Sequence, residues 1–349
     1  MVHSRLGTRH KLLIWLAFAI GTTYRVGDFM TDTITHTLSH RGFPVHVKEY
    51  ARGTSDIPLV VIGGAFQNIE QIERMSKALA KHTWVIAFDT PGNGATGVLP
   101  HDYSFDFISD CIASALEQLR VRKVNLVGFS YGSIVAMRFV QHYRPMVSRL
   151  LLGGAMHRMP EQLEYDFNLM IFYLKWDKRR EFADCFTNLM SNPELRKTNR
   201  LAKLAGEKLH NALMHANRGM REQFTHNTKR ILQFGNTDLS KLPDVPTVVF
   251  TGEHDIFVPP EANKLIADAF PRGRYESILG ADHMAHVIQF KKSVDLILRG
   301  ADAYKQKAPV QSLVFPVNDS RYGVVNQPMP GTELPAEATT ISAIDGTTH

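Results

Sequence analysis

The hydrophobic pattern in the first half of the chain alternates between two periods. Four short apolar segments have the composition of buried strands: residues 58–62 (PLVVI), 84–88 (WVIAF), 123–127 (KVNLV) and 149–152 (RLLL). Three segments between them carry apolar residues at helical spacing: residues 69–82, 105–120 and 133–143. An alternating stretch at residues 35–49, with a turn at 40–42, predicts a preceding strand pair. Strands that alternate with helices predict an α/β fold with a mostly parallel sheet and helices on both faces.

This rhythm stops at residue 156 and resumes near residue 244. Between these points no segment has the composition of a buried strand, whereas helical spacing recurs at residues 161–176, 179–190 and 199–217. The strand pattern returns at residues 247–250 (TVVF) and 274–278, before a last helix at 293–298. We therefore predict a sheet domain in two parts, residues 35–155 and 244–300, interrupted by a helical cap at residues 156–243. An insertion at this position would cover the strand ends where ligands bind in such sheets.

Both ends of the chain lie outside this predicted domain. Residues 1–34 form an N-terminal extension with an apolar run at 12–20 (LLIWLAFAI). That run is too short for a membrane span, which needs about 20 residues, and a cut after the signal-like AFA at 17–19 would leave too little apolar sequence for export. We favour a helix that docks on the protein or on a membrane surface, and hence a cytoplasmic location, with export left open. Residues 301–349 are rich in Pro, Thr, Ser and Ala, which predicts a disordered tail.

Composition narrows the function classes. The chain has 349 residues, of which 44% are hydrophobic and 21% charged, as in ordinary soluble globular proteins. The net charge is +6, yet the sequence has no run of five basic residues and no nucleic-acid-binding motif, so we expect no nucleic-acid partner. The basic excess within residues 157–243 is either a solvated face or a surface for an acidic partner protein. Cys111 and Cys185 lack the spacing of a zinc site or a disulfide framework.

A serine stands where a buried strand turns into a helix. Residues 128–132 (GFSYG) match the pattern G-x-S-x-G, and they follow the predicted strand 123–127 and open the predicted helix 133–143. The turn is strained, and flanking glycines let strand and helix approach where a Cβ would collide. A serine hydroxyl is a weak nucleophile by itself, so Ser130 needs a base and a group that orients the base.

Two later strand ends supply those groups. Residues 251–255 (TGEHD) place Asp255 after one strand, and residues 280–283 (GADH) place His283 after the next. The chain order Ser, Asp, His is typical of this arrangement. We expect His283 to deprotonate Ser130 and later to protonate the leaving group, while Asp255 fixes the imidazole tautomer. Three further titratable residues are rivals for these roles because they are close in sequence: His254, Asp282 and His286.

Together these motifs resemble the α/β-hydrolase superfamily over roughly residues 35–300. Residues 89–94 (DTPGNG) match the family's D-x-P-G-x-G loop after a sheet strand. The family usually carries His-Gly where residues 63–67 read GGAFQ, and the loss of the histidine need not harm an oxyanion hole that backbone amides build. The resemblance implies the amides of Ala65 and Tyr131 as its donors, with Phe66 as the alternative to Ala65. In this segment the chain is also similar to hydroxyacyl carrier-protein transacylases and rhamnolipid-precursor synthases, which are acyltransferases on the same fold.

Three functions remain open at this point. The first is a serine hydrolase that cleaves a small-molecule carboxylic ester or thioester through an acyl-serine, with no metal or organic cofactor. The second is an acyltransferase that moves an acyl group from a carrier-protein or CoA thioester to an acceptor, with an acidic carrier protein as partner. The third is a binding protein that keeps the fold without catalysis. Five large apolar residues of the predicted cap would either line an acyl pocket or pack the cap helices together: Phe167, Met170, Phe172, Tyr173 and Trp176.

Overall fold

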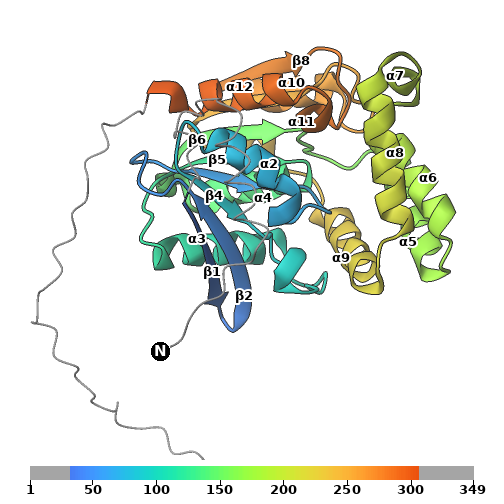
Figure 1. The fold of residues 1–349 in the computed structure, drawn as a ribbon, viewed down its shortest axis with the longest axis horizontal. Coiled ribbons are helices and arrows are strands. Elements are labelled where there is room, and N and C mark those ends of the chain that lie inside the picture. The colour runs from blue at the N-terminus through green and yellow to red at the C-terminus, as the bar shows by residue number, and fades with distance from the viewer. Residues whose placement is uncertain (1–31, 306–349) are drawn as a thin grey trace, which may run out of the picture. The chain divides into compact units, whose positions relative to one another are not determined.

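An eight-stranded sheet forms the centre of the computed structural model, which describes residues 32–305 (Figure 1). Its strands are β1 (Thr33–His40), β2 (Phe43–Tyr50), β3 (Leu59–Ile62), β4 (Val85–Phe88), β5 (Val124–Phe129), β6 (Val147–Gly153), β7 (Pro246–Gly252) and β8 (Arg272–Ile278). They lie in the order β1-β2-β4-β3-β5-β6-β7-β8. The pairs β1–β2 and β2–β4 are antiparallel, and all other neighbours are parallel. The predicted α/β fold with a mostly parallel sheet is confirmed.

The central strands are mostly apolar because both faces of the sheet are covered. Successive side chains of a strand point to opposite faces, so Val60 and Ile62 of β3 pack in one apolar layer and Val61 in the other. The first layer includes three helices of the sheet domain: α3 (Phe105–Gln118), α4 (Tyr131–His142) and α10 (Pro260–Ala269). The second is built mainly by α2 (Ile69–Leu79) and α12 (Phe290–Gly300).

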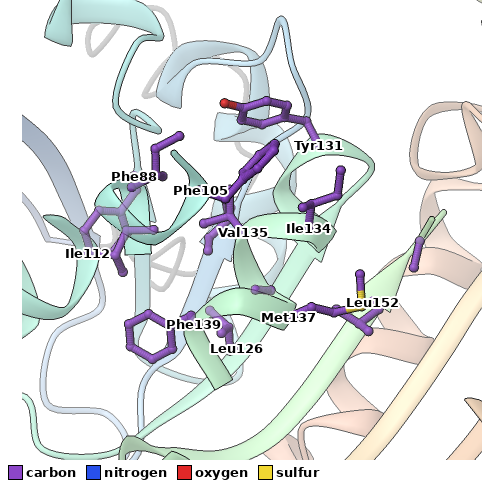
Figure 2. Close-up of a cluster of buried hydrophobic side chains, with 14 of the residues drawn as sticks. Phe88, Phe105, Ile112, Leu126, Tyr131, Ile134, Val135, Met137, Phe139 and Leu152 are labelled. Carbon is purple, nitrogen blue, oxygen red and sulfur yellow. The ribbon is translucent and has the colours of Figure 1, made fainter. Parts of the chain in front are cut away.

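The first layer fixes the helix that follows the predicted nucleophile. Figure 2 shows this layer, in which Val135 and Phe139 of α4 lie in one buried cluster with Ile112 of α3 and Leu126 of β5. All four side chains are completely buried. Removing one such side chain costs about 2–5 kcal/mol in a packed core, so the position of α4 against the sheet is well determined.

Five helices fill the chain between β6 and β7, where the cap is predicted. They are α5 (Glu161–Lys175), α6 (Arg179–Met190), α7 (Pro193–Thr198), α8 (Arg200–Met214) and α9 (Arg218–Phe234). Helix α6 contacts α5 and α8, and α5 also contacts α9. The buried apolar side chains of α5, α6 and α9 belong to the same cluster as the first layer of the core. These helices therefore pack onto the sheet domain as well as onto one another.

The apolar pattern does not predict four of the observed helices: α7, α9, α10 and α11 (Ala285–Ile288). Helix α9 is the most informative of these. Its inward face carries Asn227, Thr228 and Arg230, all buried, in place of a continuous apolar stripe. Polar residues at inward positions weaken the helical period that sequence patterns rely on.

The ends of the described chain differ in detail from the predicted boundaries. Strand β1 begins at Thr33, two residues before the predicted start of the core. Residues 301–303, predicted as the start of a disordered tail, instead pack on the core, since Ala301 and Ala303 are buried. The apolar run at 12–20 and residues 306–349 lie outside the described part. Within residues 32–305, no helix combines the length and apolar character that crossing a bilayer would need.

Candidate active site

The predicted nucleophile lies at the turn between β5 and α4. Ser130 adopts φ 51° and ψ −116°, a strained conformation for a residue with a side chain. Its N–H donates to the Gly153 carbonyl of the neighbouring strand β6 at 2.7 Å. Its carbonyl accepts both the N–H and the hydroxyl of Ser133, at 2.8 and 2.6 Å. These bonds hold the serine at the carboxyl end of a central strand, where it lines a pocket.

The glycines on either side of Ser130 are sterically required. A Cβ on Gly128 would lie 2.2 Å from the Gly132 carbonyl oxygen. A Cβ on Gly132 would lie 2.5 Å from the carbonyl oxygen of Ile62 and 2.6 Å from that of Gly63. Because these neighbours are backbone atoms, no side-chain rotation would relieve the clash. The absence of both Cβ atoms lets the first turn of α4 approach the end of β3.

Asp255 and His283 form a hydrogen-bonded pair. His283 Nδ1 lies 2.8 Å from Asp255 Oδ2, and both side chains are buried. The Thr251 hydroxyl donates to the same oxygen at 2.7 Å. The amides of Phe257 and Val258 donate to Oδ1 at 2.9 and 3.0 Å. Because a carboxylate only accepts, these contacts fix its orientation and assign the His283 proton to Nδ1, which leaves Nε2 of the neutral ring free to accept a proton.

The structure brings His283 and Ser130 to the same pocket. No direct hydrogen bond joins these two described side chains, and in enzymes without substrate such a contact is often long. The imidazole packs edge-on against Phe257, with ring centroids 4.8 Å apart. On another side it lies against Gly154, where a Cβ would be 2.8 Å from His283 Cε1. The ring is therefore confined on several sides while it lines the pocket.

Asp282 and His254, two of the three alternatives to Asp255 and His283, make contacts outside the Asp255–His283 pair. Asp282 is buried, which raises the pKa of its carboxyl, and its two oxygens accept the amides of Asn192 and Met284, both at 2.9 Å. Because Asn192 belongs to the cap, Asp282 ties the cap to the core. His254 lies 3.6 Å from the carboxylate of its neighbour Glu253, and both side chains are largely exposed.

The third rival, His286, holds the loop that follows β3. Gly64 donates its N–H to Gln67 Oε1 at 2.8 Å, and Gln67 Nε2 donates to His286 Nε2 at 2.9 Å. Burial, and after it the positive charge that His283 carries when protonated, lower the pKa of His286 to about 4, so the His286 ring is neutral and able to accept this bond. His286 thus lines the pocket as a structural acceptor, whereas the carboxylate partner belongs to His283.

The predicted oxyanion donors line the pocket together with Ser130. Gly64 O accepts the N–H of Gln67 at 3.0 Å, which closes a turn over residues 64–67. Such a turn uses the amide of its fourth residue only, and the amides of Ala65 and Phe66 bind no other described residue. The Tyr131 amide is in the first turn of α4, where helical amides lack an intrahelical partner. All three residues border the pocket, which the predicted roles require.

The pocket is apolar over most of its wall. Six of its apolar side chains come from four cap helices: Phe167, Phe186, Met190, Leu209, Phe224 and Ile231. The polar side chains that line the pocket with Ser130 include Gln67, Thr228, Thr251 and His283. An apolar chamber with a small number of polar groups is the usual form of a site for a small, largely apolar ligand.

The five apolar cap residues singled out in the sequence have different positions. Phe167 lines the pocket, and Met170 is completely buried in the core cluster. Phe172 and Trp176 point outward, with 46% and 61% of their surface exposed, and Tyr173 is partly buried. Among residues 32–305, His, Cys, Asp and Glu side chains form no group of three that could hold a metal ion.

Comparison with known proteins agrees with the observed fold. A family model described as the alpha/beta hydrolase fold matches residues 57–289. A poly(3-hydroxyalkanoate) depolymerase of Ectopseudomonas oleovorans is 33% identical over 97 residues, which cover 28% of this chain and 34% of the depolymerase. An uncharacterised protein of Mycobacterium bovis is 28% identical over 124 residues, or 36% of each chain. The chain therefore spans about a third of the length of these curated relatives.

Solved structures share the fold over a longer span. An alpha/beta hydrolase enzyme from a Medee basin deep-sea metagenome library superposes with a TM-score of 0.69 at 17% identity, covering 76% of this chain and 96% of that one. A thermophilic esterase from Thermogutta terrifontis gives 0.65 at 17% identity, covering 79% of this chain and all of that one, 100%. At such identities the likeness concerns the fold alone. Since the family model spans about two thirds of the sequence, the chain belongs to the alpha/beta hydrolase fold family.

Proposed function

We propose that the protein is a serine hydrolase that cleaves a carboxylic ester or thioester through an acyl-serine intermediate. Ser130 Oγ attacks the acyl carbon while His283 Nε2 takes its proton, and the developing oxyanion binds backbone amides. The C–O or C–S bond then breaks, and His283 returns the proton to the leaving alcohol or thiol. Water, deprotonated by His283, attacks the acyl-Ser130 ester and releases the carboxylic acid. Ser130 recovers its proton in the last step.

One observation carries this proposal. Ser130 is held at a positive φ in a pocket that it shares with His283, and His283 is paired with a buried, fully hydrogen-bonded carboxylate. Strain of this kind is stored at functional sites, where the surrounding structure fixes it. A binding protein would need neither the strained serine nor the oriented imidazole.

The wall of the pocket supports an apolar acyl group as substrate. The cap contributes aromatic and aliphatic side chains to the pocket wall, so an acyl chain would leave water as it enters. Each methylene that is buried favours binding by about 0.8 kcal/mol. The similarity to a poly(3-hydroxyalkanoate) depolymerase supports including 3-hydroxyacyl esters among the substrates to be tested.

The test combines covalent labelling with turnover. An alkyl fluorophosphonate should label wild-type protein and should not label Ser130→Ala. Hydrolysis of p-nitrophenyl esters, 3-hydroxyacyl oligoesters and acyl thioesters of rising chain length should vanish in the same variant. Ser109→Ala is the matched control, because Ser109 is buried on α3 and does not line the pocket. A folded wild-type protein that is neither labelled nor active would overturn the proposal.

The same assay separates hydrolysis from transfer. With an acceptor alcohol or a carrier-protein thiol present, a hydrolase releases mainly free acid. Transferred product that forms faster than acid would instead assign an acyltransferase, which uses the same acyl-serine but excludes water as acceptor.

A further inference from the structure

A buried arginine on the cap has no acidic partner. Arg230 of α9 is 2% exposed, yet no carboxylate in residues 32–305 lies within ion-pair distance of it. Its donors instead meet five neutral acceptors: the carbonyls of Leu99, Pro100 and Tyr103, the Tyr131 hydroxyl and Asn227 Oδ1, at 2.6–2.9 Å. Burying a cation against dipoles alone is costly. Such an arrangement calls for a role beyond filling space.

One effect of this arginine is to orient the amide of Asn227, one turn earlier on α9. Arg230 can only donate, so the atom of Asn227 that faces Nη1 at 2.8 Å must be the carbonyl oxygen. The Tyr131 hydroxyl accepts from the same nitrogen at 2.9 Å and donates to the same Asn227 oxygen at 3.3 Å. The NH2 group of Asn227 therefore has to point the other way.

That NH2 group lies against the loop that carries the proposed oxyanion donors Ala65 and Phe66, residues 63–67, here called the oxyanion loop. Asn227 Nδ2 donates to the Ala65 carbonyl and to Asn93 Oδ1, both at 3.1 Å. The Ala65 carbonyl belongs to the same peptide unit as the Phe66 N–H, so this bond sets the direction of that N–H. The Ala65 N–H belongs to the preceding peptide unit, together with the Gly64 carbonyl. The turn hydrogen bond from the Gln67 N–H to Gly64 O fixes the direction of that unit.

We propose that Asn227, oriented by Arg230, is a positioning residue that aligns the oxyanion loop for catalysis. The cap would thereby control transition-state stabilisation as well as substrate access. This inference rests on the proposed serine-hydrolase function. A second contact between the same two segments supports it: Phe66 stacks on Phe224 of α9, with ring centroids 4.4 Å apart. Asn227 touches no reacting atom and acts only through the loop.

Asn227→Asp distinguishes a role in aligning the oxyanion loop from a role in only attaching the cap to the core. The carboxylate keeps the shape of the side chain and gains an ion pair with Arg230, so the cap stays attached. It cannot donate, however, and its second oxygen would face the carbonyl oxygens of Ala65 and Asn93. Gln223→Glu is the matched control. Gln223 is on the same helix and donates to the same Asn93 oxygen at 2.9 Å, but among the described residues no hydrogen bond joins it to the oxyanion loop.

We expect Asn227→Asp to lower kcat by about 10- to 100-fold, less than the roughly 100- to 1,000-fold cost of losing an oxyanion donor outright, because the donor is misaligned and not removed. KM for a soluble ester should stay nearly unchanged. Affinity for an alkyl trifluoromethyl ketone, which becomes an oxyanion on Ser130, should fall by the same factor. Gln223→Glu should leave kcat and ketone affinity within about twofold of wild type, a change of only about 0.4 kcal/mol. Thermal unfolding checks that both variants are folded.

The inference is overturned if a folded Asn227→Asp retains wild-type kcat and ketone affinity, or if Gln223→Glu loses as much as Asn227→Asp. Should Asn227→Asp fail to fold, Asn227→Ser also lacks the Nδ2 donor and is expected to show the same selective loss of kcat. Failure of the proposed function looks different, because Ser130 in wild-type protein would then be neither labelled nor active.

Discussion

Replacing His286 by glutamine should reduce the loss of unfolding free energy that accompanies a fall in pH from 7 to 5. The neutral imidazole accepts a hydrogen bond from Gln67 Nε2 at 2.9 Å. Gln67 has no free choice of orientation, because its Oε1 already accepts the Gly64 N–H. A proton on His286 Nε2 would therefore face another donor. This geometry agrees with the direction of the shift, in which burial and the charge of His283 lower the pKa of His286 to about 4.

The magnitude follows from proton linkage. An unfolded histidine has a pKa near 6.5, so below that pH the unfolded chain binds a proton that the folded chain refuses. The stabilising contribution of the neutral ring is complete above about pH 6.5 and is lost as the pH falls towards 4. Between pH 7 and pH 5 the loss for a folded pKa of about 4 is roughly 2 kcal/mol.

Urea unfolding at pH 7 and pH 5 measures this loss directly. His286→Gln keeps a neutral acceptor at every pH, so its stability should fall by about 2 kcal/mol less than that of wild type over this interval. His254→Gln, at a largely exposed site on the same edge of the sheet, should follow wild type. Parallel pH profiles for wild type and His286→Gln would refute the reasoning, since the ring would then titrate alike in both states.

Two further changes test the supports of the site. Thr251→Val removes the hydroxyl that donates to Asp255 Oδ2 at 2.7 Å. It should lower the free energy of unfolding in urea by about 2 kcal/mol and lower kcat at constant KM. Thr251→Ser retains the donor and should behave as wild type, and equal kcat in all three proteins would contradict the role of the hydroxyl. Gly132→Ala forces a Cβ to within 2.5 Å of the Ile62 carbonyl oxygen and should destabilise the protein by about 3 kcal/mol, again by urea unfolding. Wild-type stability of Gly132→Ala would show that the turn relaxes.

Local chemistry made much of the candidate site predictable. The strained turn at Ser130 needs Gly128 and Gly132 for steric reasons. The requirement is therefore visible in the sequence as a five-residue motif. Strands buried on both faces read as continuous apolar runs, which made the parallel sheet predictable as well. The carboxyl ends of parallel strands meet at one edge, and this brought Asp255 and His283 together as expected.

The sequence favoured Asp255 and His283 as the pair, but it left Asp282, His254 and His286 as rivals. Asp282 and Asp255 both adjoin candidate histidines in sequence. Only the folded chain shows that the Asp282 carboxylate accepts a hydrogen bond from the amide of Asn192, some 90 positions away. His286 differs from His283 by three positions, yet burial and Gln67 make it an acceptor within the loop network. Long-range contacts decide such assignments, and no local spacing encodes them.

The cap is where tertiary structure decided most. Helix α9 has no clear apolar stripe because its inward face meets polar groups: Arg230 and Asn227 find their acceptors on loops near residues 65, 93 and 100. On α5 the reverse holds, since Phe172 and Trp176 are apolar but exposed. Sequence by itself determined the sheet, the turn at Ser130 and the residues at the strand ends, because backbone sterics and apolar periodicity are local. The partners of buried polar side chains were decided by the fold, because they lie far apart along the chain.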